Sequence, residues 1–131
     1  MREILFRGKR LDDGKWVEGG LLYDEEQNEA YIAEHFEDKS AYLRPIIPET
    51  VGQYTGLTDK NGKKIFEGDI CQTKGFPFID DKPFVVEWNC DECSFYWRDV
   101  LGTDEFTTGV AENTTIIGNI HDNPELMEEK V

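Results

Sequence analysis

The chain has 131 residues, of which 28 are acidic and 14 are basic, so its formal net charge at pH 7 is −14. Such a chain is a poor candidate for direct binding to nucleic acid or to anionic membranes, because both depend on Lys and Arg side chains that neutralise phosphate groups. It contains no apolar run near 18 residues, so we expect no transmembrane helix and no membrane partner.

The cellular compartment can be predicted from the start of the chain and from its cysteines. The first ten residues lack the long apolar core of a signal peptide. Three cysteines are an odd number for a secreted disulfide framework. We therefore expect a cytoplasmic protein with reduced thiols.

The composition favours an all-β fold. Aromatic residues make up 12% of the chain, and 12 Gly and 5 Pro interrupt it so often that short strands fit better than long helices. We expect a single domain over residues 1–131, built from two closely packed parts. These are an N-terminal antiparallel sheet over about residues 1–50 and a signature hairpin with a small SH3-like barrel over about 51–123, followed by a short helical tail over 124–131.

The first part begins with a predicted hairpin. Arg2–Gly8 and Lys15–Tyr23 have the pattern of two strands, and the turn Leu11–Gly14 between them contains Asp-Gly, which favours a type I′ turn. Gly19-Gly20 interrupts the second strand, which indicates a bulge or a close approach of another backbone.

Two further strands are predicted before residue 50, over Ala30–Ala33 and Ala41–Ile47. Pro45 and Pro48 bracket the end of the second one. Since proline has no N–H to donate inside a sheet, this segment is expected at an edge or in a linker. Pro48–Thr50 can open one helical turn.

The stretch Val51–Gln72 carries the strongest local signals. Asn61-Gly62 predicts a tight hairpin of type I′, in which both central residues have positive φ. Gly68 then interrupts the chain before an apolar pair, where a second sheet should begin. We expect Gly62 and Gly68 to be needed for folding, because each is placed where positive φ or close backbone contact is required.

The remainder has the spacing of a small barrel. Four strands are expected, over Asp69–Lys74, Pro83–Asn89, Ser94–Val100 and Thr114–Ile120. The chain should end in a short helical turn, with Asn123 as its cap and Pro124 in its first position.

Three blocks of the sequence resemble the YopX family. They are M-R-E-I-L-F-R-G-K at the start, V-G-Q-Y-T-G-L-T-D-K-N-G-K-K-I-F-E-G-D-I in the centre and I-I-G-N-I-H-D-N-P-E-L near the end. The resemblance implies a β-rich protein carried by phages or prophages of Gram-positive bacteria, and it supplies no catalytic residues. Cys71 and His121 depart from the usual family residues, and Cys90–Cys93 lies outside the family pattern.

Cys90 and Cys93 have the spacing of half a zinc site or of a redox pair. A zinc site needs two more ligands, and Cys71, His35 and His121 form no matching pair. Asp91 and Glu92 lie between the two thiols, and negative charge beside a thiol disfavours the reactive thiolate. We therefore interpret them as structural thiols in a hairpin turn and expect no metal and no cofactor.

No catalytic set is predicted either. Asp59, Glu67 and Asp69 could form a carboxylate cluster for a metal or for acid–base chemistry. Turn and strand-entry positions explain Asp59 and Asp69 equally well. His35 and His121 are isolated, without a neighbouring nucleophile. We expect that the protein is not an enzyme.

Two groups of basic residues remain as binding candidates. Arg2, Arg7, Lys9 and Arg10 form the first group. Lys60, Lys63 and Lys64 form the second, and with Tyr54 they could bind an acidic ligand or strand, although solvated loop lysines explain them more simply.

These observations lead to three functional hypotheses. The first is a non-enzymatic phage accessory protein that binds another protein or itself, with a basic face meeting an acidic face of a second copy. The second is an acidic mimic of nucleic acid that occupies a host DNA-binding protein, since residues 76–131 hold 13 acidic and 3 basic residues, a net charge of −10. The third, an enzyme or metal protein, has the least support.

Overall fold

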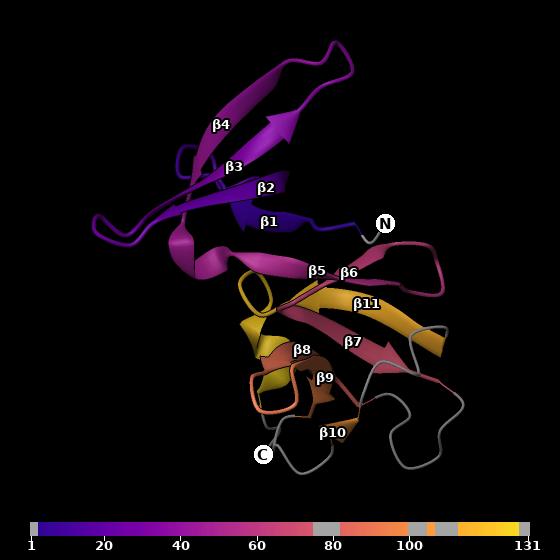
Figure 1. Cartoon of the computed structure of the whole chain (residues 1–131). Coiled ribbons are helices and arrows are strands. Elements are labelled where there is room, and N and C mark those ends of the chain that lie inside the picture. The colour runs from indigo at the N-terminus through magenta and orange to yellow at the C-terminus, as the bar shows by residue number, and fades with distance from the viewer. Residues whose placement is uncertain (1–2, 75–81, 100–104, 107–112, 129–131) are drawn as a thin grey trace. The chain divides into compact units, whose positions relative to one another are not determined.

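The structure, a computed structural model, is built from β-strands in antiparallel sheets (Figure 1). It describes residues 3–74, 82–99, 105–106 and 113–128. The prediction of an all-β fold is confirmed. The helical elements of the described residues are short 3-10 turns. The chain forms two compact units, Met1–Tyr54 and Thr55–Val131. Within the described ranges, no helix has the length and apolarity that crossing a bilayer would require.

The first unit is one curled antiparallel sheet with the strand order β4-β3-β2-β1-β5. Its elements are β1 (Phe6–Lys9), β2 (Trp16–Asp24), β3 (Glu29–His35), β4 (Ala41–Ile46), the 3-10 turn η1 (Pro48–Thr50) and the first residues of β5 (Gly52–Thr58). The strands predicted here are confirmed, although the first one starts at Phe6 in the structure. Pro45 lies in a strand at the end of this order, as expected for an edge, and Pro48 opens the predicted turn.

Alternation of side chains builds the core of this unit. Ala30 and Ile32 on β3 point inward, and their cross-strand neighbour Ile46 on β4 joins them together with Val17 from β2. Phe6, Leu21 and Val51 pack against this group. Burying such side chains stabilises the unit by roughly 1.5–3 kcal/mol for each large one.

Gly19 is required by a close backbone approach. Strand β2 pairs with β1 up to Gly19 and with β3 from Gly20 onward, so the chain changes partner between the two glycines. A Cβ atom at Gly19 would collide with the carbonyl oxygen of Ala33, whereas one at Gly20 would meet nothing within 4 Å. The prediction of a close approach is therefore confirmed at Gly19, and neither of these pairings is interrupted by a bulge.

The sheet of the first unit closes on itself at one corner. Beyond β1, Arg10 forms a bridge with Ile46. The N–H of Leu11 donates to the carbonyl of Pro45 at 3.1 Å, and the N–H of Ile47 donates to the carbonyl of Lys9 at 2.8 Å. The chain after β1 thus covers the outer edge of β4 at its C-terminal end.

The second unit contains the later part of β5, which pairs with β6, and a five-stranded sheet with the order β10-β9-β8-β7-β11. Its elements are β6 (Lys64–Phe66), β7 (Asp69–Thr73), β8 (Phe84–Asn89), β9 (Ser94–Arg98), β10 (Glu105–Phe106), β11 (Thr114–Asn119) and the 3-10 turn η3 (Pro124–Met127). The four strands predicted after residue 68 are confirmed within the described residues, and Val100, the predicted end of one of them, lies outside those residues. The strand order is open, from β10 to β11, so the SH3-like barrel is not confirmed.

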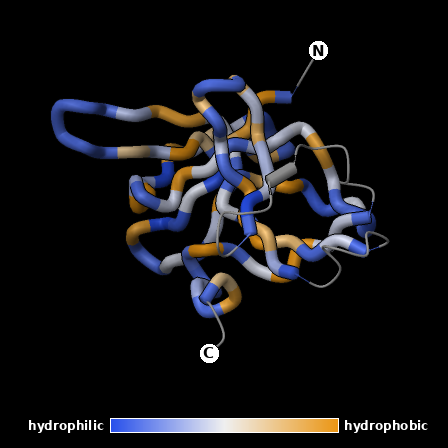
Figure 2. The backbone as a smooth tube through the Cα atoms, turned by 90° about the horizontal axis from the view of Figure 1, so that it is seen from below, coloured by the Kyte–Doolittle hydropathy of each residue, from blue (hydrophilic) through white to orange (hydrophobic). Residues whose placement is uncertain are grey.

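The core of the second unit consists of Ile65, Cys71, Phe84, Val86 and Trp97, all of them fully buried. Partly buried apolar side chains from β5, β9 and β11 pack against it. Figure 2 shows hydrophobic and hydrophilic residues interspersed along the backbone of the chain.

Two local predictions are corrected. In the β5–β6 hairpin Gly62 has φ of 81°, but Asn61 is not among the residues with positive φ, so the turn is not of type I′. The N–H of Gly62 instead donates to the carbonyl of Asp59, as in a type I turn followed by a left-handed glycine. The turn of the β1–β2 hairpin is not of type I′ either, because φ is positive at Gly14 and not at Asp13.

At the C-terminus, η3 begins after Asn123, but the Asn123 side chain makes no cap hydrogen bond to it. Its Oδ1 atom accepts from the N–H of Asn119 at 3.3 Å instead, because the side chain turns back toward β11. Gly68 has φ of 92°, which confirms the expected positive φ at the entry to β7.

Candidate functional site

The predicted ligand-binding residues lie in different environments. Lys60 and Lys63 are exposed in the β5–β6 turn, and Lys64 is exposed at the start of β6. Tyr54 is only 9% exposed and belongs to the first unit, whereas the three lysines belong to the second. The Tyr54 ring therefore offers little surface on which a ligand could stack.

The predicted carboxylate cluster is explained by turn chemistry. Asp59 is 4% exposed, and its Oδ1 accepts from the N–H groups of Asn61 and Lys63, each at 2.9 Å. Its Oδ2 accepts from the N–H of Ile116 at 3.2 Å. Burial raises the pKa of Asp59, but the three N–H donors and the nearby Lys63 charge outweigh it, so the pKa is lowered overall.

Asp69 is also buried and also accepts a backbone hydrogen bond, because its Oδ2 accepts from the N–H of Phe66 at 2.7 Å. The two buried aspartates thus stabilise backbone turns at either end of β6. Glu67, between them, is half-buried. Within the described part of the chain, no three His, Cys, Asp or Glu side chains are grouped so that they could hold a metal ion.

Cys90 and Cys93 lie in the turn between β8 and β9, and both are exposed free thiols. The Oδ1 atom of Asn89 accepts from the N–H groups of Asp91 and Glu92, which fixes the turn. The Cys93 thiol donates to the carbonyl of Cys90 at 3.6 Å. The interpretation as two thiols in a hairpin turn is confirmed.

The two histidines lie in different units. His35 is exposed at the end of β3. His121 is half-buried after β11, where its N–H donates to Oδ1 of Asn119 at 3.0 Å and its ring lies against Gly68. Each histidine is therefore described within its own unit.

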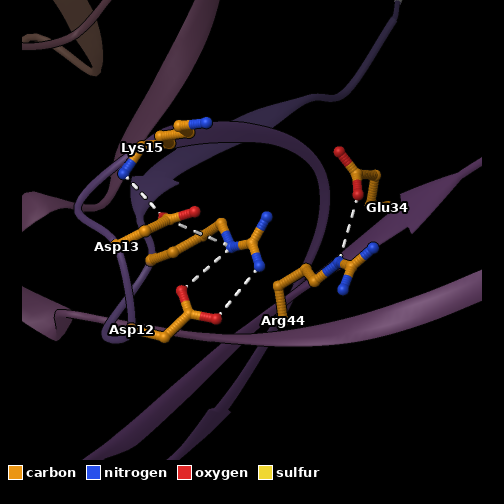
Figure 3. Close-up of polar contacts among 6 residues, drawn as sticks. Asp12, Asp13, Lys15, Glu34 and Arg44 are labelled. Carbon is orange, nitrogen blue, oxygen red and sulfur yellow. Dashed lines mark hydrogen bonds and ion pairs between the residues drawn. The ribbon is translucent and has the colours of Figure 1, made fainter.

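Part of the N-terminal basic group is paired with acidic side chains, a feature that the sequence analysis missed. Arg10 donates to Asp12 through Nε at 3.1 Å and Nη2 at 3.0 Å, and it lies 3.5 Å from Asp13 (Figure 3). The hydrogen bond with Asp12 raises the pKa of Arg10, and the same bond lowers the pKa of Asp12. Arg2 lies outside the described residues.

The remaining cations of this group lie on an aromatic ring. The guanidinium of Arg7 lies 4.7 Å from the centre of the Trp16 ring, and Nζ of Lys9 lies 5.8 Å from it. Cations over an aromatic face gain roughly 0.5–1 kcal/mol at exposed sites. Arg7, Lys9 and Arg10 of the predicted basic group therefore all contact other side chains of this protein.

A second pair of charges supports the β3–β4 hairpin. Nε of Arg44 donates to Glu34 at 3.1 Å, from one strand to the next (Figure 3). The guanidinium of Arg44 also lies 5.3 Å from the centre of the Tyr42 ring, which in turn meets Phe36 edge-on at 5.5 Å. Tyr42 and Arg44 lie on the face of this hairpin opposite to Leu43, so these contacts join β3 and β4 on that face.

A comparable network joins β8 and β9. Arg98 donates to Oε1 of Glu87 at 3.0 and 2.6 Å, and the Tyr96 hydroxyl donates to Oε2 at 2.8 Å. The hydrogen bonds from Arg98 lower the pKa of Glu87. A carboxylate held in this way is ionised at neutral pH and acts as a cross-strand support.

The most distinctive exposed feature is a set of apolar side chains on the outer face of the first sheet. Leu22 on β2 is 53% exposed and Leu43 on β4 is 56% exposed. They pair across the strands with Tyr31 and Ala33 of β3, so these four side chains share one face. We call these four residues the outer patch.

Exposed apolar side chains that are neighbours on one face indicate an interaction surface more strongly than scattered ones do. Alternation in the sequence predicts the strands that carry the outer patch. The sequence could not show that the sheet face with the outer patch stays exposed, because exposure depends on what packs against that face in three dimensions.

Comparisons with known proteins agree with this architecture. The model of the YopX protein family matches residues 5–128. The fold is similar to the crystal structure of protein EF1440 from Enterococcus faecalis, with a TM-score of 0.61 and 21% sequence identity over 98% of this chain and 100% of that chain. Identity at this level supports the fold alone. No curated protein matches the sequence.

Proposed function

Because the chain belongs to the YopX family, we propose that it is a phage or prophage accessory protein without enzymatic activity, which binds another protein in the bacterial cytoplasm. The observation that carries this proposal is the outer patch. Two leucines more than half exposed, beside Tyr31 and Ala33 on one sheet face, are the surface that a protein partner would cover.

The chemistry of the polar side chains supports a binding role over a catalytic one. Asp59 and Asp69 accept backbone hydrogen bonds, and Glu87 is held by Arg98. Each of these carboxylates accepts at least one hydrogen bond from a protein donor. A general acid or base needs a proton-accepting atom within reach of a substrate.

The proposal can be tested by comparing two leucine variants in a capture experiment. Tagged wild-type protein and the variants Leu22→Ser and Leu11→Ser are expressed in lysogenic cells, and co-purifying proteins are identified and quantified. Leu11 is a matched control, because it is 63% exposed but lies in the turn after β1, outside the outer patch.

We expect one protein to be recovered with the wild type and with Leu11→Ser, and to be depleted with Leu22→Ser. The melting temperatures of both variants should equal that of the wild type, since exposed positions usually change stability by less than about 0.5 kcal/mol. Equal recovery with all three proteins would contradict a role for the outer patch.

A second candidate function is supported by the charge distribution. The turn between β2 and β3, together with the strand ends beside it, exposes four carboxylates, from Asp24, Glu25, Glu26 and Glu29. A net charge of −10 over residues 76–131 adds to them. A nucleic-acid mimic would use such charges to bind the basic surface of a host DNA-binding protein. Recovery of such a host protein, weakened by salt and unaffected by Leu22→Ser, would favour this alternative.

A further inference from the structure

The outer edge of β4 has a hydrogen-bonding pattern that can be read from Pro45. In the β3–β4 hairpin the N–H of Phe36 donates to the carbonyl of Ser40 at 2.9 Å, so the backbone N–H of Phe36 and the backbone C=O of Ser40 point toward each other inside the hairpin. Antiparallel pairs alternate along the strands. Pro45, opposite Tyr31, therefore falls in a pair without hydrogen bonds, as it must because it has no N–H.

The same alternation determines the direction in which the backbone N–H and C=O groups of Ala41 and Leu43 point. Like Pro45, they are odd-numbered, so their N–H and C=O groups point away from β3. Farther along, the outward groups are occupied, since the carbonyl of Pro45 accepts from Leu11 and the N–H of Ile47 donates to Lys9. The uncovered edge is thus limited to the segment Ala41–Leu43, which is exposed throughout.

This short edge is complementary to itself. We propose that it pairs with the same edge of a second copy of the chain, antiparallel and around a two-fold axis at Tyr42, an inference that rests on the proposed function as a protein-binding module. In this register Ala41 lies opposite Leu43 of the other copy. Each such pair exchanges two N–H···O bonds, and the two-fold axis doubles them to four.

Neighbouring registers are less favourable for a physical reason. Shifting the axis to Leu43 places Pro45 opposite Ala41, and the pair loses the hydrogen bond that proline cannot donate. Shifting it to Ala41 places Leu43 opposite Lys39, whose φ of 70° ends the strand. The edge therefore selects one register out of three.

The side chains of the selected register are also compatible. Arg44 lies opposite Ser40 of the second copy, and Ser40 is hydrogen-bonded to Asp38 through its N–H and its hydroxyl. Each Arg44 is then near an Asp38 carboxylate, and no like charges face each other directly across the edge. On the other face, the pairing joins the two outer patches into one apolar surface.

The pairing should be weak, because four backbone bonds and a few side chains form an interface well under the size of stable dimers, about 1,200 Å² or more. It should appear in light scattering as the wild type is concentrated from about 10 μM toward about 1 mM, the affinity range of such small contacts. A wild type that stays monomeric throughout this range would overturn the proposal.

Cysteine crosslinking tests the register. In a background with Cys90→Ser and Cys93→Ser, the variant Tyr42→Cys places two thiols opposite each other, at a Cα separation of about 4.5 Å that suits a disulfide. The control Leu43→Cys places them diagonally, beyond the ~7 Å limit. We expect mild oxidation to join Tyr42→Cys at least about tenfold faster. Equal or faster crosslinking of Leu43→Cys would overturn the register.

A proline variant tests the edge itself. Leu43→Pro removes an outward N–H and leaves the hydrogen bonds to β3 intact, whereas Leu43→Ala keeps this N–H and shortens the side chain. We expect dimerisation of Leu43→Pro to be at least about tenfold weaker than that of Leu43→Ala. Equal dimerisation of the two variants would overturn edge pairing, and if Leu43→Pro fails to fold, the crosslinking result decides.

Failure of this inference is separable from failure of the proposed function. Leu22 lies on β2, two strands from the uncovered edge. Partner capture that depends on Leu22 without any Tyr42→Cys crosslink would leave the proposed function standing and reject the second copy. A Tyr42→Cys crosslink without partner capture would support pairing with a second copy and reject the capture of another protein through the outer patch.

Discussion

Removal of the Asp59 carboxylate should destabilise the second unit more than any exposed aspartate does. The carboxylate accepts three backbone N–H groups, two within its own turn and one from Ile116 on β11, and it is 4% exposed. It therefore links the β5–β6 turn to a strand more than 50 residues away in the sequence. The substitution Asp59→Ala leaves all three donors without this acceptor.

The magnitude can be worked out from the three donors. Asn61 and Lys63 are exposed, so their N–H groups can turn to water, and each bond lost costs about 0.5–1 kcal/mol. The N–H of Ile116 is partly buried, and an unsatisfied donor there costs about 1–3 kcal/mol. Asp59→Ala should lower the free energy of unfolding by about 2–5 kcal/mol, and Asp59→Asn by about half of that, because it keeps one acceptor oxygen.

The effect should depend on pH in a defined direction. The pKa of Asp59 is lowered in the folded state, so the stabilisation by the carboxylate is complete above its unfolded pKa of about 3.9 and is lost as the pH falls through the folded value. The difference in stability between wild type and Asp59→Asn should be constant near pH 7. It should shrink once the pH falls below about 4.

Urea titrations followed by tryptophan fluorescence measure these differences, since Trp88 and Trp97 lie in the same unit. Asp91→Ala is the matched control, because Asp91 is an exposed aspartate in the β8–β9 turn. It should change the free energy of unfolding by less than about 0.5 kcal/mol. If Asp59→Ala were as mild as Asp91→Ala, the structural account of Asp59 would be refuted.

Three further predictions concern backbone space, metal and nucleic acid. Gly19→Ala should destabilise the protein by more than about 1 kcal/mol, because its Cβ would meet the Ala33 carbonyl, whereas Gly20→Ala should be neutral or stabilising. Thermal melts measure the difference, and equal melting temperatures of the two variants would contradict this prediction. Elemental analysis should find no stoichiometric zinc, and about one zinc per chain that is lost in Cys90→Ser would overturn that expectation. A gel shift at about 150 mM salt should show no binding to random duplex DNA, and saturable binding below micromolar protein would refute it.

The sequence predicted the strands well because its strongest signals are local. Short segments rich in apolar residues between turn signals defined β2, β3 and β8, and Pro45 correctly marked an edge. The very short β10 was not predicted, since two residues are too few to show alternation. Local signals also predicted positive φ at Gly62 and Gly68, where the structure has it.

The errors arose where side-chain hydrogen bonds to the backbone decide the local conformation. Asn-Gly alone favours a type I′ turn, but the Asp59 side chain accepts from Asn61 and Lys63 and holds the loop in another conformation. Similarly, Asn123 was expected to cap η3, yet its side chain bonds back to Asn119. The exposure of the outer patch depends on tertiary structure, whereas the pairing of Arg10 with Asp12 and Asp13 depends on the conformation of one turn.

The charge of the chain and its uncovered edge together predict how self-association responds to salt. Two copies that each carry −14 repel each other, and added salt screens this repulsion over the Debye length, about 8 Å at 0.15 M. Backbone hydrogen bonds and apolar contacts at Ala41–Leu43 are far less sensitive to salt. Pairing through this edge should therefore tighten as the salt concentration rises.

Association of a basic face with an acidic face should show the opposite response. In that arrangement attraction between opposite charges drives assembly, and salt weakens it. Sedimentation or light scattering of the wild type at about 0.05 M and about 0.5 M salt distinguishes the two, because the screening length falls severalfold between them. A dimer that dissociates at high salt would contradict pairing through β4 and favour the head-to-tail arrangement of charged faces.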